Sequence, residues 1–377
     1  MGKVYFLTGA TGDLGSEILV ELLGQDTENT VYCLLRPKEG QNVKDRLNDL
    51  LRSMDILSQN DSRVFAVHGD LCEDLLGMDS EMYEYLAHNI DVIIHSAADV
   101  RFNQEIENIR KYNVDAVQRM LDFSKRCNHA DGKLELFVYI STAFVAGRRE
   151  GMILEGDLTD QYGFNNSYEQ TKYEAELLVK NYMSTETPSV IFRPSVIMGA
   201  SADGSFKKSS LIYPLISLLK DLLPSMIIPY SKNVELDVVP IDFVVNSILY
   251  IIQDKQNYNK YFHLAAGPGK MIDIDGELVQ GIIEILDLKN VRALPDFIWD
   301  RLLPFWKRFN KPLYRKCKKL LKMSELSGYD KYGEKNRKLM FSVENTKNAL
   351  LHSGINMPEP KHFLRACIEY AKYNYFA

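Results

Sequence analysis

Tyr168 and Lys172 stand four residues apart in a segment rich in residues that favour helices. At this spacing both side chains lie on one face of an α-helix and can reach each other. A tyrosine is a weak acid near neutral pH, but a neighbouring ammonium group stabilises the phenolate and lowers its pKa toward the working range. The pair could therefore exchange a proton with a substrate, although tyrosine and lysine at this spacing also occur on many solvated helices.

Two hydroxyl residues, Ser141 and Thr142, directly follow the apolar run 136–140, and Thr142 stands five residues before Gly147. Such a run is typical of a buried strand. The carboxyl ends of the strands in an open parallel sheet border the crevice in which ligands bind. We therefore expect these hydroxyls to face the site in which the tyrosine and the lysine act.

Three glycines at three-residue spacing, Gly9, Gly12 and Gly15, follow the apolar run 4–7 and open a helical pattern. Glycine lets the backbone turn tightly and approach a ligand closely, so that amide N–H groups and the positive end of the helix face a pyrophosphate. An ordinary glycine-rich turn is the alternative, but strand, glycines and helix occur here in the register of a dinucleotide-binding loop. The predicted contacts from this loop are Gly9, Thr11, Gly12, Asp13, Leu14 and Gly15.

The residue that follows the second apolar run distinguishes between dinucleotides. A fold that binds NAD places an acidic side chain on the ribose 2′-hydroxyl, about twenty residues after the last glycine. Arg36 occupies that place in this chain, with Lys38 as a candidate second cation. A guanidinium can form two parallel hydrogen bonds with a 2′-phosphate, so Arg36 favours NADP(H). A solvated surface arginine is the alternative interpretation.

The elements that must position these residues follow from the alternation of short apolar runs with helical patterns. Such alternation predicts an α/β fold, a doubly wound parallel Rossmann sheet with helices on both faces. Segment 16–23, for example, places its aliphatic residues on one helical face. The expected strands are Val4–Leu7, Val31–Leu35, Val64–Val67, Val92–Ile94, Leu136–Ile140 and Val190–Phe192.

Longer helical segments predominate beyond Gly199, interrupted by two strand-like runs, 236–239 and 261–265. We expect both runs to return to the sheet, and the remainder to cover the carboxyl ends of the strands as a smaller lobe. The predicted parts are an NADP-binding Rossmann domain, residues 1–199 with returning segments near 233–265, and a mostly helical C-terminal substrate-binding lobe, residues 200–232 and 266–377.

The composition narrows the classes of function. The net charge of −6 argues against a general nucleic-acid binder, which needs an excess of lysine and arginine. The five scattered cysteines lack a C-x-x-C pair, so we expect neither a disulfide framework nor a metal site. They fit a reducing cytoplasm, and the early strand-like run leaves no room for a cleavable signal segment. Charges and prolines interrupt the apolar stretch 211–228, so no transmembrane segment is expected.

Together these motifs resemble those of the extended short-chain dehydrogenases/reductases, in which a hydroxyl residue five before a glycine is followed by Y-x-x-x-K. The resemblance implies that Thr142, rather than Ser141, hydrogen-bonds the reacting oxygen. It also implies that Tyr168 exchanges the proton, that Lys172 tunes Tyr168 and holds the nicotinamide ribose, and that Asn113 positions the proton relay. Taken alone, Asn113 would be interpreted as a polar residue that faces a neighbouring helix.

Further matches to the superfamily run through most of residues 1–265. Segment 69–71 is similar to its adenine contact, segment 95–98 to the strand beneath its cofactor, and segment 193–195 to its nicotinamide edge. The resemblance thus implies cofactor contacts from Asp70, Leu71, Ser96, Ala97, Ala98, Pro194 and Ser195, together with Tyr168 and Lys172.

Within the superfamily, stretches 31–36 and 151–176 are similar to thioester reductases and fatty acyl-CoA reductases. This implies NADPH-dependent reduction of an acyl thioester, bound to coenzyme A or to a carrier protein, to an aldehyde, with further reduction to the alcohol left open. Hydride addition to the thioester carbonyl would give an oxyanion held by Thr142 and Tyr168, and the hemithioacetal would then lose its thiol.

Two other functions remain open. One is an extended dehydrogenase or epimerase that acts on a nucleotide sugar or a sterol-like alcohol, and the other is a non-catalytic NADP(H)-binding regulator. Sugar-nucleotide dehydratases of the superfamily carry two acidic residues after the catalytic threonine, where this chain has Ala143 and Phe144. The apolar stretch 195–199 is also unlike the sugar enzymes. A regulator has no need of the hydroxyl, tyrosine, lysine and asparagine together.

A basic tract follows the two tryptophans, Trp299 and Trp306. In a net acidic protein this tract could contact an acyl carrier protein, a coenzyme A phosphate or an anionic membrane surface. A solvated lobe helix with its aromatic residues in the core is at least as good an interpretation. The tract comprises Lys307, Arg308, Lys311, Arg315, Lys316, Lys318, Lys319 and Lys322.

Overall fold

The computed structural model describes ten ranges of the chain and a few single residues. No helix among them is long and apolar enough to cross a membrane, and no group of three or more histidine, cysteine, aspartate or glutamate side chains among them is arranged to hold a metal ion. Most of the apolar stretch 211–228 lies outside these residues. The described residues are 2–38, 40–54, 62–101, 104–129, 132–183, 185–206, 227–230, 235–287, 292–295 and 339–375, with 304, 307, 308, 311 and 315.

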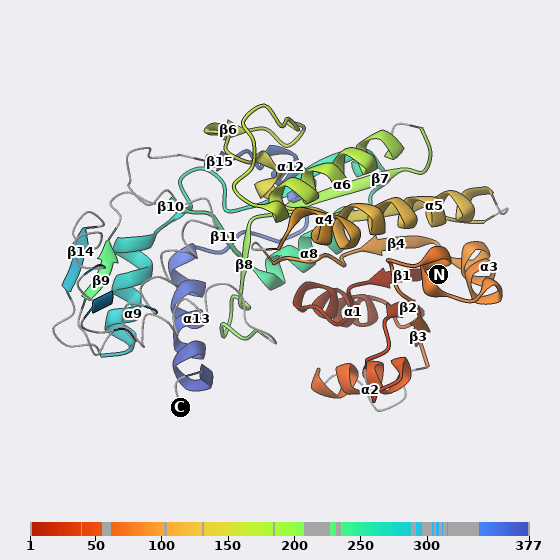
Figure 1. Ribbon diagram of the computed structural model, residues 1–377, viewed down its shortest axis with the longest axis horizontal. Coiled ribbons are helices and arrows are strands. Elements are labelled where there is room, and N and C mark those ends of the chain that lie inside the picture. The colour runs from red at the N-terminus through yellow and green to blue at the C-terminus, as the bar shows by residue number, and fades with distance from the viewer. Residues whose placement is uncertain are drawn as a thin grey trace.

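A seven-stranded parallel sheet forms the centre of the larger part of the molecule (Figure 1). Its strand order is β12-β7-β5-β4-β1-β2-β3. Strands β2 and β3 lie on one side of β1 and the later ones on its other side, as in a doubly wound fold. All six strands expected in the first two hundred residues belong to it, so the predicted fold class is confirmed. The strands are β1 (Val4–Thr8), β2 (Thr30–Leu35), β3 (Val64–His68), β4 (Val92–His95), β5 (Leu136–Ile140), β7 (Ser189–Pro194) and β12 (Lys260–Leu264).

Helices cover both faces of this sheet (Figure 1). Successive strand residues point to opposite faces, so Leu7 and Ile94 belong to one core while Phe6 and Ile93 belong to the other. One face carries α1 (Asp13–Gln25), α2 (Val43–Ser53) and α8 (Ile241–Ile251). The other carries α3 (Ser80–Asn89), α5 (Ala116–His129) and α6 (Ser167–Met183). A short helix α4 (Ile106–Arg110) continues into α5 through a π-helical turn, η2 (Lys111–Asp115).

The smaller lobe lies beside the carboxyl ends of the strands, at the left in Figure 1. It is held by short ladders, in which β9 pairs in parallel with β14 and β10 pairs antiparallel with β13. The π-helical segment η6 (Ile274–Val279) leads into α9, which packs on α13. The elements are β9 (Ile227–Tyr230), β10 (Glu235–Leu236), β13 (Ile272–Asp273), β14 (Arg292–Pro295), α9 (Gln280–Ile285) and α13 (Pro360–Tyr375).

The expectation that the run 236–239 returns to the sheet is wrong. It divides into β10 and β11 (Val238–Pro240), and β11 pairs with β8 (Val196–Met198) outside the main sheet. The reason is Asp237, whose buried carboxylate accepts the N–H groups of Ala266 and Gly267 at 2.8 and 3.2 Å. These two bonds hold the segment around Asp237 at the end of β12, so that it does not lie alongside β12 as a further strand of the sheet. The run 261–265 does join the sheet, as β12.

A segment near the C-terminus closes over the loop that follows β5. There β15 (Leu339–Phe341) pairs in parallel with β6 (Gly151–Ile153), and α12 (Glu344–Leu350) begins beside them. Glu155 is buried and accepts the N–H groups of Asn345 and Thr346 at the start of α12, at 2.7 and 3.2 Å, as well as that of His263. A carboxylate at a helix N-terminus satisfies N–H groups that have no partner within the helix. The remaining short elements are η1 (Asp74–Gly77), η3 (Ala143–Ala146) and η5 (Lys255–Asn257).

Candidate active site

The glycine loop between β1 and α1 makes a tight turn. Gly9 has a φ of +78°, and a Cβ atom on it would lie 2.8 Å from the backbone nitrogen of Ala97. A Cβ atom on Gly15 would lie 2.2 Å from the carbonyl oxygen of Gly9. Gly12 precedes the first turn of α1 and donates its N–H to that same oxygen at 2.8 Å. Backbone segments therefore approach so closely that only glycine fits at positions 9 and 15, which leaves the start of α1 accessible to an anion.

A cavity of about 650 Å³ opens beside this loop at the carboxyl ends of β1, β2 and β4. Its volume is that of a small-molecule or cofactor site. The predicted cofactor contacts that line it are Gly9, Thr11, Gly12, Arg36, Asp70, Leu71, Ser96, Ala97 and Ala98. The predicted contacts that do not line it, within the described part of the chain, are Asp13, Leu14, Gly15, Pro194, Ser195, Tyr168 and Lys172.

Three arginines line the cavity: Arg36 and Arg46 are hydrogen-bonded to each other, and Arg101 pairs with Asp99. The Arg36 guanidinium lies 3.8 Å from the Asp70 carboxylate and 5.8 Å from the centre of the Tyr112 ring, and the Arg36 side chain is 57% exposed. Arg46, in the first turn of α2, also lines the cavity and donates from Nη1 to the carbonyl oxygen of Arg36. Lys38 is not among the described lining residues. Sequence reasoning missed Arg46, although its place in the first turn of the helix after Arg36 was a usable signal.

Beneath the cavity, the end of β4 is fixed to β1 by side-chain hydrogen bonds. Thr8 Oγ1 lies 2.9 Å from His95 Nδ1 and accepts the N–H of Ala97 at 3.2 Å. Burial lowers the pKa of His95 to about 3, so the ring is neutral at physiological pH. The ring stacks on that of Tyr139 in β5, with the centroids 6.0 Å apart. The strand beneath the cavity is thus held by a neutral histidine.

Thr142 and Tyr168 come together at the carboxyl end of β5. Thr142 caps η3, accepting the N–H of Phe144 at 3.3 Å, and donates to the Pro194 carbonyl oxygen at 3.5 Å. Tyr168 lies in the first turn of α6, which begins here because the Asn166 side chain accepts the N–H of Glu169 at 2.9 Å. Burial raises the pKa of Tyr168 to about 12, while a hydrogen bond with Thr142 lowers it. The phenol is therefore protonated at neutral pH and ready to donate.

Lys172 lies one turn further along α6, with a side chain only 2% exposed. Its Nζ donates to the Ile140 carbonyl oxygen at 2.7 Å and lies 4.3 Å from the centre of the Tyr139 ring. Burial lowers the pKa of Lys172 to about 7, and the charge of Glu176 acts in the opposite direction. The ammonium and amine forms are therefore both populated near neutral pH, at a position directly behind the hydroxyl pair.

Asn113 fastens the cavity wall to α6 from within the π-helical turn η2. Its Oδ1 accepts the N–H of Asp99 at 2.7 Å, and its Nδ2 donates to the Asp99 carbonyl oxygen at 2.9 Å and to Thr171 Oγ1 at 3.1 Å. Asp99 lines the cavity, and Thr171 lies between the tyrosine and the lysine on α6. π-Helical turns are frequent at functional sites. In this turn the Asn113 side-chain amide therefore bonds both to the cavity wall and to α6.

A buried ion pair that the sequence interpretation missed lies behind these residues. Glu176 and Arg193 have fully buried side chains, and Arg193 Nη2 lies 2.5 Å from Glu176 Oε1. Ser141 donates its hydroxyl to the same carboxylate, which leaves Thr142 as the hydroxyl beside Tyr168. Arg193 Nη1 also donates to the Glu155 carbonyl oxygen at 3.0 Å. The spacing of Glu176 from Lys172, again four residues, was the signal available in the sequence.

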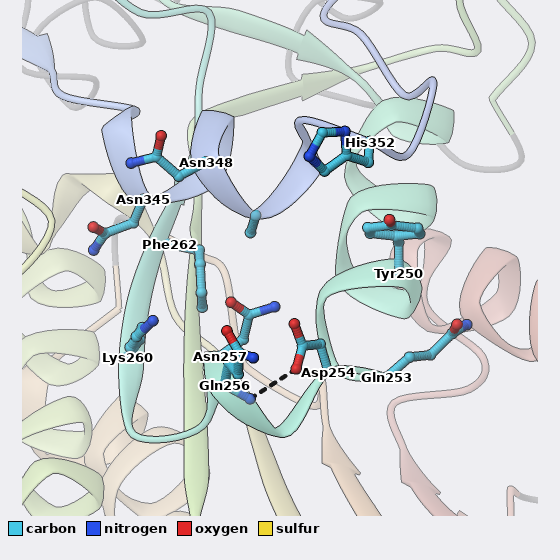
Figure 2. A pocket seen from close by; sticks show the side chains of 11 residues that line it. Tyr250, Gln253, Asp254, Gln256, Asn257, Lys260, Phe262, Asn345, Asn348 and His352 are labelled. Atoms are coloured by element: carbon cyan, nitrogen blue, oxygen red, sulfur yellow. Dashed lines mark hydrogen bonds between the residues drawn. The ribbon is translucent and has the colours of Figure 1, made fainter.

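A second cavity, of about 580 Å³, lies at the other end of the sheet, where β12 begins (Figure 2). It is bordered by the end of α8, by η5 and by α12, and its floor is the buried ring of Phe262. Most of its polar residues, such as Asn348 and His352, are exposed. None of the predicted site residues lines it. The chemistry expected of this chain therefore belongs to the first cavity and the hydroxyl pair.

Comparisons with known proteins match this chain to a family model and to several curated relatives. A family model described as "Male sterility protein" matches residues 7–248. The nonribosomal peptide synthetase asaC of Aspergillus flavus is 27% identical over 95% of this chain, which spans 36% of that protein. The chloroplastic fatty acyl-CoA reductase 2 of Arabidopsis thaliana is 25% identical over 67% of this chain, which spans 51% of it. The chain thus spans between a third and about half of these relatives.

Solved structures with the same fold cover the whole chain. The terminal R domain from the myxalamid PKS-NRPS biosynthetic pathway superposes with a TM-score of 0.82 at 25% identity, covering 100% of this chain and 92% of that one. A thiolation-reductase di-domain from an archaeal non-ribosomal peptide synthetase superposes with a TM-score of 0.77 at 21% identity, covering 100% and 77%. The similarity therefore extends beyond the sheet to the smaller lobe.

Proposed function

Because this chain belongs to the male sterility protein family, within the thioester-reductase branch of the extended short-chain dehydrogenases/reductases, we propose that it reduces an acyl thioester to an aldehyde with NADPH. The observation that carries the proposal is the Thr142–Tyr168 hydroxyl pair beside a dinucleotide-sized cavity. Nonribosomal peptide synthetases and fatty acyl-CoA reductases are the relatives whose names fit this chemistry.

The hydroxyl pair is suited to stabilise the negative charge that develops on the thioester oxygen. When bound, the nicotinamide would supply the hydride. Two hydroxyl groups that already lie together need little reorganisation as the oxygen becomes charged, which is the main source of such stabilisation in enzymes. Because the pKa of Tyr168 is about 12, its phenol is protonated at neutral pH and could give its proton to the oxyanion that hydride addition would leave, which would yield the hemithioacetal.

Lys172 and Asn113 would support that proton transfer. The ammonium of Lys172 would favour the phenolate left on Tyr168 after the transfer, and would bind the ribose hydroxyls of the cofactor. Asn113 would hold α6 against the cavity wall and order the path by which the phenol regains its proton. Loss of thiol from the hemithioacetal then yields the aldehyde. Whether a second reduction to the alcohol follows depends on how long the aldehyde stays bound.

The preference for NADPH over NADH is assigned to Arg36, with Arg46 as its neighbour. We expect Arg36→Asp to lower the NADPH/NADH ratio of kcat/KM by about 10²-fold, because two charge-assisted hydrogen bonds to the 2′-phosphate contribute roughly 3 kcal/mol. Steady-state kinetics with both cofactors measures the ratio. Lys38→Asp introduces the same charge change outside the cavity and serves as the control. An unchanged ratio in the Arg36 variant would contradict the 2′-phosphate assignment.

A thioester on a carrier protein is one substrate that we propose, because a similar structure is an archaeal thiolation-reductase di-domain. Four residues of the basic tract are described, Lys307, Arg308, Lys311 and Arg315, and all are exposed. The tryptophans and the rest of the tract lie outside the described residues, so docking of a carrier, of coenzyme A or of an anionic membrane there stays a prediction. The scattered cysteines, which lack a C-x-x-C pair, would suit a reducing compartment such as the cytoplasm.

The test is to mix the purified protein and NADPH with acyl-CoA thioesters, the same acyl groups on a carrier protein, free aldehydes and UDP-sugars. We expect thioesters to be reduced, with loss of nicotinamide absorbance and an aldehyde that can be trapped as a hydrazone. A faster reaction of the carrier-bound acyl group than of the CoA form would support a carrier partner. Turnover of a nucleotide sugar while every thioester and aldehyde stays inert would instead overturn the proposed function.

A further inference from the structure

The Glu176–Arg193 pair is an unusual feature for the middle of a hydrophobic core. Both side chains are fully buried, and Arg193 also donates from Nε to the two carboxylate oxygens at 3.0 and 3.2 Å. Ser141 donates a further hydrogen bond to Glu176 Oε2. The desolvation of two buried charges can exceed their mutual attraction, so such a pair is weak evidence for stability alone. Its position relative to the catalytic lysine offers another reason for it.

Glu176 lies one helical turn from Lys172 on α6, so the carboxylate and the ammonium face the same strands. The other titratable groups around Lys172 are Tyr168 on the same helix, His95 from β4 and Tyr139 from β5. Burial keeps both phenols protonated and the histidine neutral at pH 7. Glu176 is therefore the one anion among the described residues that face Lys172. Arg193 approaches from β7 and bonds to Glu176.

We propose that Glu176 is a positioning residue for the reaction: its carboxylate, oriented by Arg193 and Ser141, keeps Lys172 in the ammonium form, and that ammonium in turn keeps Tyr168 an effective acid. This inference rests on the roles given to Tyr168 and Lys172 in the proposed function. Arg193 sets how strongly Glu176 acts, since the guanidinium neutralises part of the carboxylate's field. The pair thus adjusts the charge of the lysine without touching the substrate.

The fact that burial brings the pKa of Lys172 to about 7 makes the lysine sensitive to such an adjustment. At pH 7 a downward shift of one pKa unit lowers the charged fraction of the lysine from about one half to about one tenth, and an upward shift raises it to about nine tenths. A group whose folded pKa lies well above 7 would not respond in the same way. The charge of Glu176 acts on Lys172 in the direction of the ammonium form, and its effect on the charge of the lysine is largest near pH 7.

The experiment measures the pKa of Lys172 directly, by ¹³C NMR of the protein labelled at lysine Cε, with the signal assigned through Lys172→Arg. We expect Glu176→Gln to lower the pKa of Lys172 by about one unit, because an opposite charge at this range typically shifts a pKa by that amount or more. Arg193→Met should raise it, because the carboxylate then acts without its counter-charge. The pH at which kcat falls on the alkaline side should shift in the same direction as the pKa of Lys172 in each variant. A purely structural role would lower kcat at every pH and move neither quantity.

Two further variants keep the test decisive. Glu174→Gln removes a carboxylate from the same helix that pairs instead with Arg110, and it should leave the pKa of Lys172 unchanged. If Glu176→Gln does not fold because Arg193 is left unpaired, the double variant Glu176→Gln/Arg193→Met removes both charges and should still lower the pKa of Lys172, by less than Glu176→Gln does, because the repulsion from the Arg193 guanidinium is removed together with the carboxylate. An unshifted Lys172 in a folded variant without Glu176 would overturn the inference. The titration needs no substrate, so a shifted lysine with no thioester turnover would instead count against the proposed function.

Discussion

Tyr168→Phe is expected to lower kcat for thioester reduction by about 10²–10⁴-fold, the range that a positioned proton donor contributes. The substitution removes only the hydroxyl that hydrogen-bonds Thr142 and leaves the ring in place at the start of α6. Because Tyr168 does not line the dinucleotide cavity, the dissociation constant for NADPH should change little. Single-turnover kinetics and fluorescence titration with NADPH measure the two quantities separately.

Tyr173→Phe is the matched control for this substitution. Tyr173 lies on the same helix, but its ring packs on that of Phe164, with the centroids 5.1 Å apart, away from the hydroxyl pair. Removing its hydroxyl should leave kcat near the wild-type value. If Tyr168→Phe also retained near wild-type kcat, Tyr168 would lose the role of proton donor. If it lost NADPH binding together with kcat, the hydroxyl would act on the cofactor instead.

Gly15→Ala is expected to weaken NADPH binding by roughly 5- to 150-fold, which corresponds to about 1–3 kcal/mol of backbone strain. The added Cβ would lie 2.2 Å from the Gly9 oxygen and 2.7 Å from the Gly9 carbonyl carbon. Both contacts are with backbone, so no flexible side chain can move aside to relieve them. The turn that faces the pyrophosphate must shift instead. Isothermal titration with NADPH, together with the melting temperature of the unliganded protein, measures the effect.

Gly24→Ala makes the same chemical change at the far end of the same helix. Gly24 is exposed, and a Cβ atom there would meet nothing within 4 Å. Alanine favours a helix over glycine by about 0.5–1 kcal/mol, so this variant should be slightly more stable and should bind NADPH normally. Gly15→Ala should therefore weaken NADPH binding, whereas Gly24→Ala should leave it unchanged and slightly raise the stability of the protein. Equal NADPH affinity in both variants would show that the loop tolerates a side chain at Gly15.

The parts of this molecule that depend on local sequence were predictable. Six strands of the sheet and the tight glycine loop follow from apolar runs and from glycine at fixed spacing, because neighbouring residues decide both features. Arg36 was predictable for the same reason, since it directly follows the second strand. Arg46 was missed although its place in the first turn of the next helix was a signal, because its part in the cavity depends on a hydrogen bond to the Arg36 carbonyl oxygen, ten residues earlier.

The features that depend on long-range packing were not predictable. The pairing of Glu176 with Arg193 requires α6 and β7 to meet, and the helical spacing from Lys172 indicates only that Glu176 shares its face. Asp237 turns its strand away from the sheet through bonds to a loop about thirty residues later. A run of apolar residues reports that a strand forms, but not which neighbour it pairs with. That choice is made by buried polar side chains, whose partners are distant in the sequence.

The anchoring of α12 by Glu155 also orders events in time. Its bonds to Thr346 join residues 191 positions apart, and β15 completes the wall of the loop that holds Thr142 only by pairing with β6. Contacts of such long range form late in folding, whereas the first βαβ units can assemble from local contacts. A chain emerging from the ribosome would thus have its nucleotide cleft before it has a finished catalytic loop.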